Sequence, residues 1–281
     1  MFRKLFPIFL VLVLLTACSI YIDIPVKNTG PEITDEISVP VPDSNGTTRL
    51  IIGFGAGELT ILPGAETLVS GTATYNIEDL KPEVSTSGST VNLKQGDYHI
   101  TGLPSSMEVV NRWDLQLGDD PMDLEIEAGA YQAEYDLGGL ALTNLSIQDG
   151  AADVEMAFSS PNLAEMSLLR YETGASSISL NGLANANFSN MQFEGGAGNF
   201  TLDFSGELKR DATVTIEASL GNLTLIIPEN TPATIQAESG LSNLDIPSAW
   251  SQDGNIYTQT GSGASLYFVI QLGAANLVVR P

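Results

Sequence analysis

The stretch GAGNFTLDF, residues 196–204, decides the fold, because similar segments recur along most of the chain. Six copies have alanine at the second position and two have leucine, and from Ala130 to Leu241 successive copies lie 21 to 24 residues apart. A repeat of about 22 residues is typical of one supersecondary unit stacked on its neighbours. The second positions are Ala56, Ala130, Ala151, Ala175, Ala197, Leu220, Leu241 and Ala274.

Each copy alternates apolar and polar residues, and the alternation changes parity at the same place in every copy. In one copy Val214 and Ile216 precede the shift, and Leu223 and Leu225 follow it on the opposite parity. A strand has period two, so a parity change turns core residues outward unless the backbone bends or bulges there. Glycine and asparagine, which accept such conformations, are frequent at the shift. We therefore expect a strand, a corner and a second strand in each copy.

These units predict an all-β fold, a single-stack β-solenoid of about 22-residue coils in which each coil pairs with its neighbours. A β-sandwich is the alternative, but it would need antiparallel hairpins about every 8–12 residues. The sequence does not determine the handedness, and a right-handed turn is only slightly favoured. We expect regular coils over residues 124–281 and an N-terminal cap with irregular coils over residues 48–123. A hairpin within residues 250–264 is expected to cover the other end.

The N-terminal segment MFRKLFPIFLVLVLLTAC, residues 1–18, has the layout of a secretory signal peptide. Its apolar run from Leu5 to Leu15 is shorter than the roughly 20 residues that span a bilayer. The last four residues, Leu-Thr-Ala-Cys, resemble a bacterial lipobox. We expect a lipoprotein signal peptide over residues 1–17, lipidation at Cys18 and an extended tether over residues 18–47. An ordinary signal peptide with an incidental cysteine is the alternative.

The composition excludes several classes of function. The chain has 281 residues with 34 acidic and 11 basic side chains, a formal net charge of −23, one cysteine and one histidine. Nucleic-acid binding is excluded because it needs a basic face that replaces phosphate counterions. A single cysteine excludes a disulfide framework, and one cysteine with one histidine cannot supply the ligands of a cysteine and histidine zinc site. The sequence predicts no cofactor and assigns no metal site or catalytic residue.

One set of acidic residues recurs with the repeat, three positions before the alanine or leucine. If the copies stack in register, these residues form an outward column with a spacing of about 4.8 Å. Two interpretations are open: a solvated face that keeps the protein soluble, or a ladder that collects divalent cations or cationic partners. The column consists of Glu127, Glu172, Glu194, Glu217 and Glu238, with Gln148 and Gln271 among them.

Three segments carry a resemblance to a known family. NRWDLQLGDDPMDLEIEAGA (residues 111–130), GAGELTI (55–61) and NGLANANF (181–188) resemble the toast-rack family of bacterial lipoproteins. That family is similar to adhesin β-solenoid domains and to cell-wall-active-antibiotics-response proteins. The resemblance covers residues 48–281 and implies the fold, but it supplies no catalytic residues. An aspartate that the family's repeat often has is replaced here in most copies, which argues against an aspartate ladder that binds metal.

These observations together predict a non-enzymatic, lipid-anchored scaffold on the outward side of a bacterial membrane. It would bind in an adhesin-like manner or associate with the envelope, and the expected partners are the membrane, an envelope protein or a glycan. One alternative is a component of an envelope-stress response. A less favoured alternative is a carbohydrate-active enzyme on a β-helix, which would need two carboxylates facing each other across a cleft. The sequence does not indicate an oligomeric state.

Overall fold

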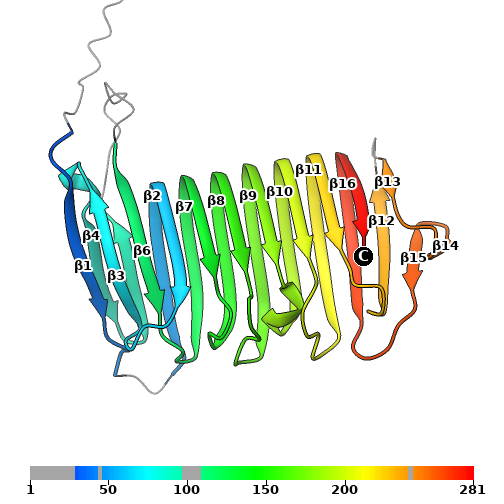
Figure 1. The fold of residues 1–281 in the computed structure, drawn as a ribbon, viewed down its shortest axis with the longest axis horizontal. Helices are drawn as coiled ribbons and strands as arrows, with labels where there is room; N and C mark the ends of the chain where they lie inside the picture. The colour runs from blue at the N-terminus through cyan, green and yellow to red at the C-terminus, as the bar shows by residue number, and fades with distance from the viewer. Residues whose placement is uncertain (1–28, 44–45, 97–108, 240–242) are drawn as a thin grey trace, which may run out of the picture.

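The computed structural model describes residues 29–43, 46–96, 109–239 and 243–281. This part of the chain is all-β, with sixteen strands in one mixed, largely parallel sheet and two short 3-10 segments (Figure 1). The long strands are β2 (Thr48–Pro63), β7 (Met122–Asp136), β8 (Leu142–Ala157), β9 (Met166–Asn181), β10 (Phe188–Asp203), β11 (Ala212–Ile226) and β16 (Leu266–Arg280). The shorter elements are β1 (Ile33–Val39), β3 (Val69–Tyr75), η1 (Glu78–Leu80), β4 (Pro82–Ser87), β5 (Thr90–Gln95), β6 (Asn111–Leu117), η2 (Leu183–Ala186), β12 (Ala233–Ser239), β13 (Leu244–Asp245), β14 (Ser251–Asp253) and β15 (Ile256–Gln259).

The seven long strands pair in parallel with the repeats in register. Between β10 and β11, for example, Ala197 lies opposite Leu220. The predicted parity change is confirmed, because β11 buries Val214 and Ile216 in its first half and Leu223 and Leu225 in its second. The sequence predicted two strands per copy, whereas each long strand runs unbroken through the corner. Every copy bends at the same position, so the pairing between neighbours continues across the bend.

The corner brings the backbones of successive coils into close contact. Gly221 has φ 119°, and a Cβ atom built on it would lie 1.9 Å from the carbonyl oxygen of Gly198 in the preceding strand. Only glycine combines a left-handed φ with so close an approach of two backbones. Inside the bend, Phe193 and Phe200 from the two halves of β10 meet edge to face, with ring centroids 5.2 Å apart. The core therefore lies between the two halves of the strands.

The order of strands in space departs from their order in the sequence at both ends of the array. β16, the last strand in the chain, lies between β11 and β12, although β12 follows β11 in the sequence. At the other end β2 lies beside β7, and β5 and β6 cover the two halves of its outer edge. A strand inside the array needs partners along both edges. The unbroken β2 and β16 pair along the whole edge of β7 and β11, respectively. The shorter β5, β6, β12 and β13 each pair along only part of β2 or β16.

Antiparallel strands cover both ends of the array (Figure 1). At the C-terminal end the predicted hairpin is confirmed: β14 and β15 pair with each other, and β15 pairs with β12. At the N-terminal end β3 pairs with β6, and β1 pairs with β3. The expectation of an extended tether over residues 18–47 is therefore wrong for residues 33–39, which form β1. Ile37 and Val39 on this strand are buried, and burial of apolar side chains is the physical reason that the segment joins the sheet.

Candidate functional site

The predicted acidic column lies on the outer surface just before the corner. The parallel register places Glu127 beside Gln148, Gln148 beside Glu172, Glu172 beside Glu194 and Glu194 beside Glu217. Gln271 then stands between Glu217 and Glu238, because β16 is inserted between β11 and β12. The two glutamines interrupt the row of carboxylates and so reduce repulsion between neighbouring like charges, which is about 1 kcal/mol at 4 Å in water-like surroundings.

Basic side chains of the protein already contact several members of the column. Lys94 Nζ lies 3.2 Å from a carboxylate oxygen of Glu127. Arg170 forms an ion pair with Glu172 and lies 3.8 Å from Glu194. Among the residues that the structure describes, no group of three or more His, Cys, Asp or Glu side chains is arranged to hold a metal ion. Glu127, Glu172 and Glu194 therefore already have basic partners within the protein, and both interpretations of the column, the solvated face and the cation ladder, stay predictions.

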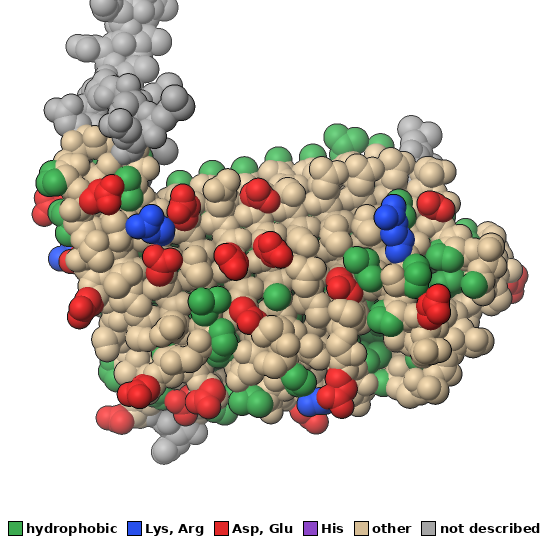
Figure 2. Space-filling model, viewed as in Figure 1, with side chains coloured by type: hydrophobic (Ala, Val, Ile, Leu, Met, Phe, Trp, Pro, Cys, Tyr) green, Lys and Arg blue, Asp and Glu red, His purple; other side chains and the backbone are tan. Residues whose placement is uncertain are grey.

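The outer face after the corner is divided by charge. Four of the six positions that follow the corner on β2, β7 and β8 are acidic: Glu58, Glu134, Asp153 and Glu155 form an acidic strip, with Thr60 and Gln132 among them and a shallow hollow of about 380 Å³ beside it. The corresponding positions on β9, β10, β11 and β16 are uncharged. Figure 2 shows this face, with carboxylates over β2, β7 and β8 and an uncharged area over the middle of β9, β10 and β11. The polar members of this uncharged set form what we call the neutral face, and the eighth position, Val278 on β16, is apolar. The neutral face consists of Ser177, Ser179, Asn199, Thr201, Asn222, Thr224 and Asn276.

Asparagine amides on the neutral face form a hydrogen-bonded ladder. Asn222 Nδ2 donates to Asn199 Oδ1 at 2.9 Å, and Asn276 Nδ2 donates to Asn222 Oδ1 at 3.1 Å. All three side chains are exposed to solvent. The ladder fixes the orientation of each amide, which a single exposed asparagine would not do. From the sequence, asparagine at these positions was expected only to allow the bend of the backbone, and the ladder was not predicted.

A buried cluster of three tyrosines and one aspartate lies at the corner of β7, β8 and β9. Asp149 accepts hydrogen bonds from the hydroxyls of Tyr171 at 2.8 Å, Tyr131 at 3.4 Å and Thr173. Tyr135 donates to the hydroxyl of Tyr131 at 3.3 Å. This cluster was not predicted from the sequence. A signal was present, because Asp149 occupies an inward position that holds Ala128, Thr173, Gly195, Ala218 or Leu272 in other copies.

The tyrosine cluster predicts that the fold becomes unstable at high pH. Burial raises the pKa of Tyr131, Tyr135 and Tyr171 above the ordinary value of 10. Below pH 10 the phenols are neutral in both states, so this stabilisation is complete. As the pH rises above 10 the unfolded chain releases protons that the folded chain keeps, and the free energy of unfolding falls by about 1.4 kcal/mol per pH unit for each phenol.

An alkaline titration measures this effect, with tyrosinate absorbance and the circular dichroism of the sheet recorded together. We expect tyrosinate from these three residues to appear only as the sheet signal is lost. The variant Tyr135→Phe removes one of the three phenols, so its stability should fall less steeply with pH. Full ionisation of all eight tyrosines before any loss of the sheet signal would contradict the prediction.

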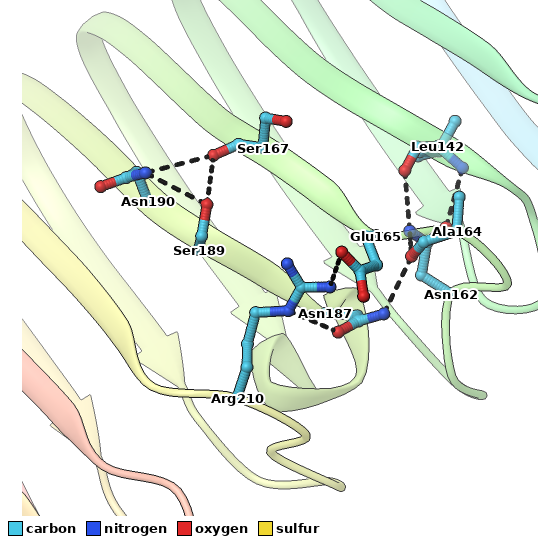
Figure 3. Close-up of polar contacts among 9 residues, drawn as sticks. All are labelled: Leu142, Asn162, Ala164, Glu165, Ser167, Asn187, Ser189, Asn190 and Arg210. Carbon is cyan, nitrogen blue, oxygen red and sulfur yellow. Dashed lines mark hydrogen bonds and ion pairs between the residues drawn. The ribbon is translucent and has the colours of Figure 1, made fainter.

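On the side opposite the corner, polar side chains join the loops of successive coils (Figure 3). The Asn162 side chain accepts a hydrogen bond from the backbone N–H of Leu142 and donates to the carbonyl oxygens of Leu142 and Ala164. Arg210 donates to Asn187 Oδ1 at 3.1 Å and forms an ion pair with Glu165 at 3.2 Å. The hydrogen bonds of Asn162 to Leu142 and of Arg210 to Asn187 connect segments about one repeat apart, and the Glu165–Arg210 ion pair spans two repeats, so we assign these contacts to holding the coils together.

Two residues singled out by the sequence are not in the described part of the structure. Cys18, the expected lipidation site, and His99, the single histidine, both lie outside the described residues. Within those residues, none of the helical segments has the length and apolar character needed to cross a membrane.

Comparisons with known proteins add a family and a fold. The sequence model for the N-terminal domain of toast_rack, DUF2154, matches residues 28–168. No functionally curated protein matches the chain. A candidate cell adhesion protein from Clostridium sporogenes is similar in structure, with a TM-score of 0.50 and 20% identity over 89% of this chain and 99% of that one. A candidate adhesin from Bacteroides fragilis gives a TM-score of 0.34 and 10% identity over 89% and 97% of the two chains. A candidate lipid-binding protein from Parabacteroides distasonis gives 0.34 and 11% over the same shares.

Proposed function

The chain belongs to the toast_rack family, and from this premise we propose that it is an exported, lipid-anchored surface protein that binds partners without catalysis. In this proposal the array is a β-solenoid whose coils present the same outward positions along its length. The partner in this proposal is an envelope component or an external surface, and the similar protein from Clostridium sporogenes is named as a candidate cell adhesion protein.

The observation that carries the proposal is the register of the long strands. Side chains at equivalent positions stand in straight rows across β2 and β7 to β11, continued by β16. Such rows form an extended, rigid surface in which many similar contacts repeat at the strand spacing of about 4.8 Å. Repeat proteins use extended surfaces of this kind for binding. The hollows along the outer faces before and after the corner are shallow.

The proposed anchor is the lipid attached at Cys18. Multiple acyl chains give stable membrane attachment, since each buried methylene contributes about 0.8 kcal/mol. The residues between Cys18 and β1 would then separate the array from the membrane. The net charge of −23 supports a position away from an anionic membrane surface, because like charges repel.

Replacing the proposed lipidation site tests the anchor. When the full chain is expressed in bacteria that are fed radioactive palmitate, we expect label on the wild-type protein and none on Cys18→Ala. The wild type should sediment with membranes, and the variant should move largely to the soluble fraction because it lacks acyl chains. Cys18→Ser serves as a second variant. Label on either variant, or equal sedimentation of all three proteins, would contradict lipidation at Cys18.

Cell adhesion tests the binding function. Bacteria that display the full chain are expected to adhere to surfaces coated with envelope extract several-fold more than bacteria without it, by the multivalency of many displayed copies. Bacteria that express Cys18→Ala make the matched control, because release of the protein should remove adhesion. Equal adhesion of displaying and non-displaying cells would reject the proposed function.

A further inference from the structure

We propose that the neutral face, Ser177 to Asn276 on β9, β10, β11 and β16, binds the hydroxyl groups of an uncharged glycan. The inference rests on the proposed binding function and names the partner class and the surface. It is carried by two independent observations: the amide ladder and the division of the outer face by charge.

The ladder presents hydrogen-bonding groups that match sugar hydroxyls. An asparagine amide has two N–H donors and an oxygen that can accept twice. The ladder uses one N–H of Asn222 and accepts one hydrogen bond at its oxygen. A second N–H and a second acceptor site of the same amide are not used by the ladder. A donor beside an acceptor is the pattern that a hydroxyl complements, because a hydroxyl both donates and accepts.

The geometry repeats this pattern across several strands. Asn199, Asn222 and Asn276 form one row, and Thr201 and Thr224 stand two residues farther along their strands on the same face. Rows on a sheet are about 4.8 Å apart between strands, and equivalent positions are about 6.6 Å apart along a strand. The groups are therefore held in a flat grid before a ligand arrives. Preorganised groups lose little conformational entropy on binding.

The charge pattern selects an uncharged ligand. None of the seven residues of the neutral face is charged, and the acidic strip borders it on β2, β7 and β8. The net charge of −23 repels polyanions. A polycation would be drawn to the acidic strip or the acidic column, where the carboxylates are, and away from the neutral face. A chain of neutral sugars meets neither repulsion nor competition, and its hydroxyls match the ladder.

The test uses the purified full chain in detergent, titrated with fluorescent dextran, mannan or β-glucan as neutral probes and alginate as the anionic probe. We expect at least one neutral polysaccharide to bind and alginate not to bind. The variant Asn222→Asp with Thr224→Glu extends the acidic strip over the neutral face, and it should weaken binding about tenfold or more through lost hydrogen bonds. Asn222→Ala, which breaks the ladder without adding charge, should also weaken binding.

The matched control places the same two charge changes on β10 before the corner, as Asn190→Asp with Gln192→Glu. Both positions are exposed on the outer face before the corner, so this control should bind the polysaccharide like the wild type. Equal melting midpoints of all variants would show that each of them is folded. Binding of no neutral probe, equal binding of alginate, or equal loss in the control would overturn the inference. If one of these results occurs while bacteria that display the full chain still adhere more than bacteria without it, only the role of the neutral face is rejected. If the displaying bacteria adhere no more than the others, the proposed function itself is rejected.

Discussion

Replacing Gly221 with alanine is expected to lower the free energy of unfolding by about 3 kcal/mol or more. The added Cβ would lie 1.9 Å from the carbonyl oxygen of Gly198, and the residue has φ 119°, so both the space and the backbone conformation disfavour a side chain. The contact joins two strands in the middle of the array, where neither backbone can move without disturbing the next coil. Chemical denaturation followed by circular dichroism measures the loss.

Gly263→Ala is the matched control for Gly221→Ala. Gly263 also has a left-handed φ, 94°, but a Cβ atom there would meet nothing within 4 Å. This variant should lose only the conformational preference of glycine, about 1 kcal/mol, and the difference between the variants isolates the clash at the corner. Ala275, beside Gly221 on β16, is a non-glycine residue at the equivalent position. An unchanged stability of Gly221→Ala would therefore mean that the corner can adopt the conformation found at Ala275.

The second large effect is expected for Asn162→Ala, with a loss of about 2–4 kcal/mol in the free energy of unfolding. Asn162 is 1% exposed, and its side chain makes three hydrogen bonds to the backbone of Leu142 and Ala164. Alanine would remove all three and leave buried backbone groups of Leu142 without their partner. An unpaired buried polar group loses its hydration without compensation, which is the reason for the large effect.

Asn190→Ala provides the comparison for Asn162→Ala. Asn190 also donates to a backbone carbonyl, that of Ser167 at 3.4 Å, but it is exposed (Figure 3). Water replaces the lost hydrogen bond there, so the change should stay within about 0.5 kcal/mol. Denaturation midpoints of the two variants, measured side by side, check the pair of predictions. Similar small losses in both would show that the loops accommodate water at Asn162.

The sequence predicted the strands and their register because both depend on local patterns. Alternation of apolar residues marked both halves of β11, and the parity change between Ile216 and Leu223 marked the corner. Similar copies at nearly constant spacing stack most simply in register, since this brings like positions into rows. The row of Glu127, Glu172, Glu194 and Glu217 was therefore predictable residue by residue. Whether that row binds a ligand could not be predicted from the sequence.

Features that depend on contacts distant in sequence were missed. β16 lies between β11 and β12. This position depends on which strand pairs best with neighbours on both of its edges, and no local sequence pattern shows which strand that is. The strand at residues 33–39 was hidden because its charged and apolar residues resemble a tether until Ile37 and Val39 are covered by other strands. The hydroxyls around Asp149 of β8 likewise come from the two neighbouring coils, β7 and β9.

The sequence by itself determined that the chain is built from in-register β-repeats with a corner, because side-chain period and glycine conformation are local properties of the backbone. It also determined the strong negative charge and the rows in which part of it lies. Only the tertiary structure decided the order of the coils at the two ends, the buried tyrosine cluster and the division of the outer face into an acidic strip and a neutral face. Those features arise where side chains from different coils meet, and their energies depend on distances that the sequence does not contain.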